Sequence, residues 1–246
     1  MTQDTDIGGQ GHTFPHTRLS AVRSLSSPDA SIRRRGYETL VACYWKPVYK
    51  YIRLKWLADN EEAKDLTQTF FAHALEKEVL ARYEPGRAAF RTYLRTCLDS
   101  FVMNERKAST RLKRGGDRPL LSLDYSAADV ELSFHPASGN EDPDEYFRRE
   151  WTRSVFEQAV ERLRAFLAAS QKHVPLALFE RYDLSQRRAD ERLTYDDLAR
   201  EFNLPVTQVT NFLALARREF RRAVMDTLRD LTGSDEEFRE EAARLM

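Results

Sequence analysis

The sequence predicts an all-α protein, and three observations support this fold class. Apolar residues recur at spacings of three and four along several segments, which is the period of a helix with one buried face. No segment has the alternating, β-branched-rich pattern of a strand. Hydrophobic residues make up 41% of the chain and charged residues 32%, against usual shares of about 45–50% and 25%. We therefore expect helices with a large solvated surface.

The length of 246 residues suits two small helical domains joined by a flexible linker, because one domain commonly takes roughly 100 to 200 residues. Residues 1–16 are polar, contain glycine and lack a period, so we expect them to be disordered. The first helical domain is predicted over 17–116, the linker over 117–143 and the second domain over 144–232. Residues 233–246 are predicted to form a C-terminal helical tail.

Helix starts in the first domain are marked by proline and by capping side chains. Pro28 and Asp29 mark the start of one helix. Pro47 is expected in the first turn of a new helix, where its missing N–H is tolerated. Asp59 or Asn60 is expected to cap a further helix, whose first turn carries the acidic residues that suit the helix dipole.

The stretch 90–114 sorts apolar and basic side chains onto opposite sides of one predicted helix. The apolar stripe consists of Phe90, Tyr93, Leu94, Cys97, Leu98, Phe101 and Val102. The opposite side is polar and basic, with Arg91, Arg95, Ser100, Asn104, Arg106, Lys107 and Arg111. Such a face suits a phosphate backbone. An ordinary solvated helix face explains this feature equally well.

A second recognisable pattern lies beyond the predicted linker, which is rich in proline and glycine and shows no sustained period. Thr194 and Asp197 resemble a capping box at the start of a short helix. The segment 203–205 is expected to form a tight turn before a longer, basic helix. This order is the helix-turn-helix arrangement, whose second helix enters the major groove. Taken alone, the pattern more often reflects plain helix packing.

Several function classes are disfavoured by the sequence. The five histidines fall in separate segments without metal-ligand spacing, and no phosphate-binding glycine loop is present, so we expect no enzyme, metal or cofactor. Cys43 and Cys97 are interpreted as buried thiols in a reducing compartment. No apolar run approaches the ~18 residues of a membrane span and no signal-peptide pattern is present. We expect a cytoplasmic protein that does not enter a membrane.

Two segments in this order resemble bacterial RNA polymerase sigma factors of the extracytoplasmic-function (ECF) type, in the sigma-70 superfamily. The segment EEAKDLTQTFF at 61–71, followed by FRTYLR at 90–95, resembles their first conserved domain. The segment 193–222 resembles the second, and the phrase PLLSLD at 119–124 is similar to a subgroup. The resemblance covers roughly 37–222. It implies a transcription initiation factor that binds core RNA polymerase, directs it to promoters and assists promoter melting.

The resemblance also implies roles for individual residues. Polymerase docking would involve Glu62, Asp65, Gln68, Thr69 and Phe71, although core packing is an equal alternative for Phe71. The minus-ten element would meet Tyr83, Arg87, Arg91, Arg95, Ser100, Asn104, Arg106, Lys107 and Arg111. An unstacked base would be held in the loop around 83–87. The minus-thirty-five element would meet Thr207, Gln208, Thr210, Asn211, Arg217, Arg218 and Arg221.

Departures from the family pattern keep alternatives open. Thr210 or Phe212 stands where many members carry a basic residue, so a helical adaptor with a sigma-like fold that does not bind DNA is the main alternative. A free-standing repressor is a third hypothesis. Thr69 stands where a carboxylate is frequent, so phosphorylation of Thr67 or Thr69 could supply the charge; two ordinary surface threonines are the alternative. Expected partners are core RNA polymerase and promoter DNA, with an anti-sigma factor or a Ser/Thr kinase as regulators.

Overall fold

The computed structural model describes residues 20–109, 123–134, 142–185 and 193–245, and this part of the chain is all-α. It contains ten α-helices, a short 3-10 turn and a short π turn, and no strand. The predicted fold class is therefore confirmed. The predicted disorder of 1–16 and the predicted helix end beyond 109 lie outside the described residues.

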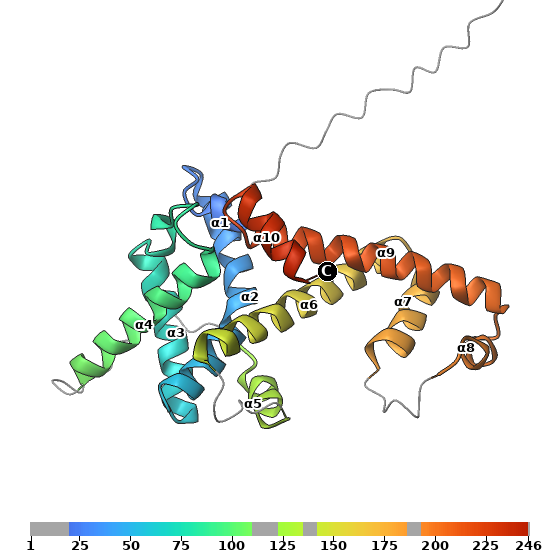
Figure 1. Cartoon of the computed structure of the whole chain (residues 1–246), viewed down its shortest axis with the longest axis horizontal. Helices are drawn as coiled ribbons and strands as arrows, with labels where there is room; N and C mark the ends of the chain where they lie inside the picture. Colours follow the sequence, from blue (N-terminus) through green and yellow to red (C-terminus); the bar gives the residue numbers. More distant parts are fainter. Residues whose placement is uncertain (1–19, 110–122, 135–141, 186–192, 246) are drawn as a thin grey trace, which may run out of the picture.

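The first four helices form the left part of Figure 1. They are α1 (Ala21–Ser24), α2 (Ala30–Lys55), α3 (Asn60–Glu76) and α4 (Phe90–Ser109). The Asp29 carboxylate accepts from Ser31 N and Ile32 N at the start of α2. At the start of α3, Asp59 accepts from Glu62 N, as expected of a capping residue.

The expected helix start at Pro47 is wrong, because α2 continues unbroken through it. An internal proline removes one helical hydrogen bond and costs about 3 kcal/mol. Tyr44, Val48, Tyr51 and Ile52 on this stretch are fully buried. Burial of these side chains on several sides of the helix outweighs the local penalty, and the sequence pattern around Pro47 does not show that burial.

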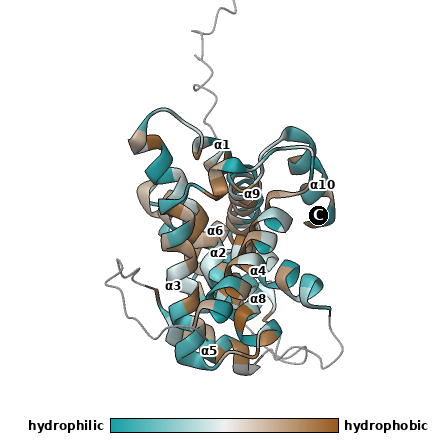
Figure 2. Cartoon of the chain, turned by 90° about the vertical axis from the view of Figure 1, so that its left-hand side faces the viewer, coloured by the Kyte–Doolittle hydropathy of each residue, from teal (hydrophilic) through white to brown (hydrophobic). Residues whose placement is uncertain are grey.

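Two long helices, α6 (Pro143–Ala169) and α9 (Val206–Asp230), cross the molecule and pack against each other, and α6 also packs on α2 (Figure 1). In the view of Figure 2, hydrophobic residues follow α6 and α9 through the middle of the molecule. The main core includes Trp151 and Val155 of α6 and Leu228 of α9 together with residues of α1 to α4. The predicted linker therefore does not separate this core from the second half of the chain.

A second group of helices lies at the far end of α9, on the right of Figure 1. It comprises α7 (His173–Phe179), the π turn η2 (Glu180–Leu184) and α8 (Tyr195–Phe202). Leu178 of α7, Leu198 of α8 and Leu213 of α9 share a small buried cluster. Both reciprocal hydrogen bonds of the Thr194–Asp197 capping box are present at the start of α8.

Two shorter helices complete the described chain. The helix α5 (Tyr125–Phe134) lies within the range predicted as a linker, and α10 (Asp235–Leu245) forms the predicted helical tail. Tyr125 and Ala128 of α5 are buried in the main core, and Asp129 and Glu131 of α5 form hydrogen bonds with Tyr49 and Lys50 of α2. At ten residues this helix is shorter than the window over which a helical period can be recognised in a sequence. No helix in the described ranges is long and apolar enough to cross a membrane.

Candidate nucleic-acid interface

The start of α9 presents the side chains that the sequence predicts to read DNA. Thr207, Gln208, Thr210 and Asn211 are all exposed. Between them, Val209 and Leu213 are fully buried against Leu198 of α8. The Thr210 hydroxyl donates to the Val206 carbonyl at 3.0 Å, so its proton is engaged within the helix while its methyl group stays available to a partner. Apolar anchors thus fix a helix whose first two turns expose amide and methyl groups.

The turn before α9 is set by Asn203 and Pro205. Asn203 adopts a left-handed conformation at φ 51°, which asparagine tolerates better than most residues. Its N–H and that of Leu204 donate to the last carbonyls of α8. Pro205 then stands just before α9, where its fixed φ suits a helix start. Local chemistry therefore holds α8 and α9 at a defined angle.

Arg217 pairs with an acidic side chain of the same protein and is not free to contact a phosphate. Its guanidinium pairs with Asp183 at 2.9 Å, donates to the Tyr195 hydroxyl at 3.0 Å and lies 5.3 Å from the Tyr182 ring centroid. The hydrogen bond with Asp183 raises the pKa of Arg217. We therefore correct its expected role: Arg217 ties η2 and α8 to α9. Arg218 pairs with Glu219 at 3.2 Å but remains 68% exposed at its side chain, and Arg221 is exposed.

A hollow lies at the loop 83–87, where an unstacked base is expected. It has a volume of about 200 Å³, and Tyr83, Arg87 and Tyr93 contribute to its lining. The two tyrosine ring centroids lie 5.4 Å apart. Gly86 permits the turn, with φ at +93°. Arg87 is exposed and pairs with Glu84 at 2.7 Å. The hollow combines aromatic faces and a cation, the groups that hold a single-stranded base.

Two arginines of α4 that were expected to contact phosphates are occupied within the chain. Arg91 pairs with Glu241 of α10 at 2.6 Å and lies 5.2 Å from the Trp151 ring, with 12% of its side chain exposed. Arg95 pairs with Asp144 at 2.9 Å, with 17% exposed. Glu241 of α10 and Asp144 of α6 are distant in sequence, and Arg95 also pairs with Asp99 of its own helix at 3.2 Å. We therefore correct both assignments to structural ion pairs.

The remaining predicted residues of α4 form a narrower strip. Ser100, Asn104 and Lys107 are exposed and follow helical spacing along one side. Arg106 pairs with Glu62 at 2.9 Å and lies 5.6 Å from the Trp56 ring centroid, so it joins α4 to α3. Arg111 lies outside the described residues.

Only some of the α3 residues that are predicted to contact polymerase are accessible on the surface. Asp65 is exposed, and Gln68 and Thr69 are half-buried. Phe71 is fully buried, its ring 5.2 Å from that of Phe70, and its carbonyl accepts from the Tyr37 hydroxyl. Phe71 is therefore a core residue and not a docking contact.

Thr67 must also be corrected. It is fully buried, and its hydroxyl donates to the Ala63 carbonyl at 2.7 Å. A kinase cannot reach this oxygen in the folded chain, so only Thr69 remains for the phosphorylation hypothesis.

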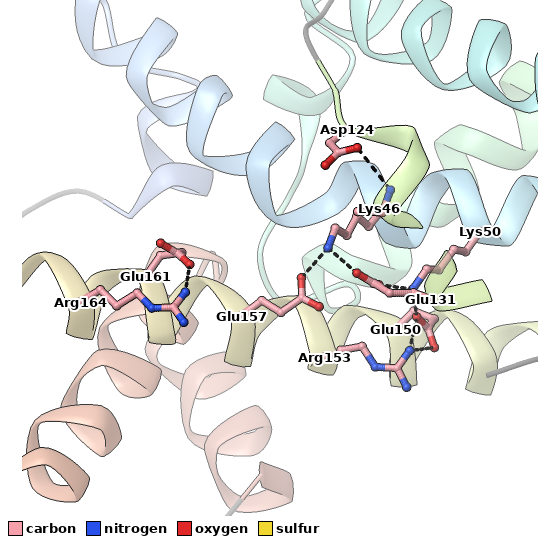
Figure 3. A network of polar contacts seen from close by, with 10 residues as sticks. Lys46, Lys50, Asp124, Glu131, Glu150, Arg153, Glu157, Glu161 and Arg164 are labelled. Carbon is pink, nitrogen blue, oxygen red and sulfur yellow. Dashed lines mark hydrogen bonds and ion pairs between the residues drawn. The ribbon is translucent and has the colours of Figure 1, made fainter. Parts of the chain in front are cut away.

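The sequence did not reveal how α5 is attached. Lys46 and Lys50 of α2 both pair with Glu131 of α5 at 2.7 Å. Lys50 also pairs at 2.7 Å with Glu150 of α6 (Figure 3). Burial raises the pKa of Glu131, but the hydrogen bonds from Lys46 and Lys50 and their charges outweigh it and lower that pKa overall. Lys46 and Lys50 lie 85 and 81 residues before Glu131, so the sequence gives no local signal of this pairing.

The contact of α10 with the loop was likewise missed. Glu237 accepts from Phe90 N at 2.6 Å and from Gly233 N at 2.8 Å, and its carboxylate lies 3.1 Å from the Tyr83 hydroxyl. Burial raises the pKa of Glu237 despite these donors. Glu237 and Glu241 are one helical turn apart, which places them on one face. That spacing was the available signal, but it does not identify their partners.

Comparison with known proteins adds no assignment. No protein-family model matches the chain, and no curated protein matches it. The functional argument therefore depends on the arrangement of the residues themselves. Within the described ranges no group of three or more His, Cys, Asp or Glu side chains could hold a metal ion.

Proposed function

We propose that the chain is a cytoplasmic transcription initiation factor of the sigma type, which binds core RNA polymerase, directs it to promoters and assists promoter melting. The observation that carries this proposal is the exposed start of α9, with Gln208 and Asn211 presented above a buried anchor. The proposed role is non-enzymatic. Its regulator would be an anti-sigma factor or a Ser/Thr kinase that acts on Thr69.

In this proposal α8, the turn 203–205 and α9 act as a helix-turn-helix. Gln208 and Asn211 are one turn apart, and each can form a bidentate pair with adenine in the major groove. The Thr210 methyl group suits the methyl group of thymine. Arg218 and Arg221 follow along the helix and would contact phosphates. The expected preference is therefore for A·T-containing sites.

The second DNA surface is proposed at the opposite end of the molecule. The hollow beside Tyr83 would take an unstacked base, and the strip on α4 would follow the adjoining strand. Polymerase would dock on the face of α3 that carries the exposed Asp65 and the half-buried Thr69. Both ends act on DNA, which is what a factor that selects and opens promoters requires.

The test begins with co-purification of the full chain with core polymerase from its source organism, followed by sequencing of transcripts that the mixture initiates in vitro. Gln208→Ala or Asn211→Ala should then cost roughly 1 to 3 kcal/mol of binding at the upstream element and relax base preference there. Gln158→Ala on α6 is the matched control and should change neither. Equal losses of Gln208→Ala on cognate and scrambled DNA would contradict base reading.

A non-DNA-binding adaptor is the second candidate, and one observation favours it. The first three turns of α9 contain no lysine or arginine, and Arg217, which follows them, is held by Asp183. Electrostatic contacts supply most non-specific DNA affinity. An adaptor would co-purify with polymerase but start no promoter-specific transcript, so the same experiment separates the two candidates.

A further inference from the structure

The C-terminal helix α10 contacts the part of the molecule that carries the Tyr83 hollow. Glu237 is 8% exposed, and both of its carboxylate oxygens are used. One accepts from Phe90 N at 2.6 Å, and the other accepts from Gly233 N at 2.8 Å. Phe90 is the first residue of α4, where a backbone N–H has no partner within its own helix. A residue 147 positions away therefore supplies the acceptor.

The same carboxylate reaches the aromatic wall of the hollow. The Tyr83 hydroxyl lies 3.1 Å from Glu237 and 2.8 Å from the Ala88 carbonyl. The ring of Tyr83 lies edge-on to Phe90, with centroids 5.1 Å apart. Both ends of the loop are thus bonded to one side chain, through the Tyr83 hydroxyl before it and the Phe90 amide after it.

The turn between α9 and α10 fixes the other side of the Tyr83 ring. A Cβ atom on Gly233 would lie 2.4 Å from Cε1 of Tyr83, so only glycine allows this approach. The Gly233 carbonyl accepts from Arg23 Nε of α1 at 2.8 Å, which holds the turn against the first helices. The position of the tyrosine ring is therefore set by contacts from two directions.

We propose that Glu237 and Gly233 are positioning residues for the Tyr83 hollow, so that the C-terminal helix is part of the device that holds an unpaired base. This inference depends on the proposed function and deepens it by assigning a role to the tail. A base stacks on a ring only if the ring presents a fixed face, because a mobile ring loses that contact to conformational entropy. Glu237 touches the ring and the start of α4, and not the base.

The test compares Glu237→Gln with Glu236→Gln in the full chain. The glutamine keeps one oxygen for Phe90 N, but its NH2 group cannot accept from Gly233 N or Tyr83. Glu236 is exposed and adjacent on the same helix, so it is a matched control. Hydrogen exchange at the Phe90 amide and thermal unfolding report on each variant without polymerase. Permanganate reactivity of promoter thymines reports DNA opening in the reconstituted holoenzyme.

We expect Glu237→Gln to lower the opened fraction about tenfold, equivalent to about 1.4 kcal/mol, with polymerase affinity and upstream duplex binding unchanged. Glu236→Gln should behave as the wild type. If Glu237→Gln does not fold, Gly233→Ala replaces it, since it displaces Tyr83 while leaving every charge in place. Normal opening despite faster exchange at Phe90 would overturn the inference. A parallel loss of polymerase affinity would also overturn it, because the role would then be merely structural.

Failure of the proposed function gives a different result. In that case the wild-type chain neither binds polymerase nor opens promoter DNA. The positioning claim is then judged with a fluorescent single-stranded oligodeoxynucleotide of mixed sequence as the probe. Weaker binding by Glu237→Gln than by Glu236→Gln supports it, and equal binding overturns it.

Discussion

Replacement of Lys50 by methionine should destabilise the whole protein, because this buried lysine joins three helices. Its side chain is 2% exposed, and its Nζ lies 2.7 Å from carboxylate oxygens of both Glu131 and Glu150. Breaking a buried ion pair costs about 3 to 5 kcal/mol when a charge is left without a partner. Here Glu150 keeps Arg153 at 2.9 Å and Glu131 keeps Lys46 at 2.7 Å. We therefore expect the lower end, about 3 kcal/mol.

In a chain of this size each kcal/mol shifts Tm by about 2 to 4 °C, so Lys50→Met should lower Tm by about 6 to 12 °C. Circular dichroism during heating and urea titration measures the change. The contrast is Arg34→Met, which removes an ion pair with Glu38 on the same helix whose side chains are 82% and 60% exposed. Exposed pairs contribute about 0 to 1 kcal/mol. Equal losses for the two variants would refute the argument that burial decides the cost.

Three further predictions concern charge. Arg221→Ala should reduce the salt dependence of upstream DNA binding by about 0.9 in slope, whereas Arg239→Ala on α10 should leave it unchanged; equal slopes would remove Arg221 from the interface. Because folding lowers the pKa of Glu131, its ion pairs contribute fully to stability above the unfolded pKa of 4.5. That contribution is lost as the pH falls below 4.5 and through the lower pKa of the folded protein. The protection of α5 amides against hydrogen exchange, measured relative to the intrinsic rate at each pH, should therefore fall on acidification in the wild type and depend less on pH in Glu131→Gln. Thr69→Glu should fold and raise polymerase affinity, while Thr67→Glu should unfold the chain because that side chain is fully buried; a well-folded Thr67→Glu would contradict the burial argument.

The features that could be predicted from the sequence are those decided within one or two helical turns. The Asp59 cap and the Thr194–Asp197 box were predicted because the bonded atoms lie three residues apart. The exposed start of α9 followed from the spacing of its buried residues. Arg91 and Arg95 were misassigned because an arginine on a helix surface has the same local pattern whether its partner is a phosphate or a carboxylate from another helix. Only the packing of α6 and α10 against α4 decides between the two.

One helix connects the two surfaces proposed to read DNA. The 25 residues of α9 begin beside the exposed Gln208 and end just before Gly233, which touches Tyr83. At 1.5 Å per residue this helix is about 37 Å long. Its second half is buried in the main core through Val224 and Leu228, so it cannot pivot without disturbing that core. The spacing between the two proposed surfaces is therefore set by a helix instead of a flexible linker.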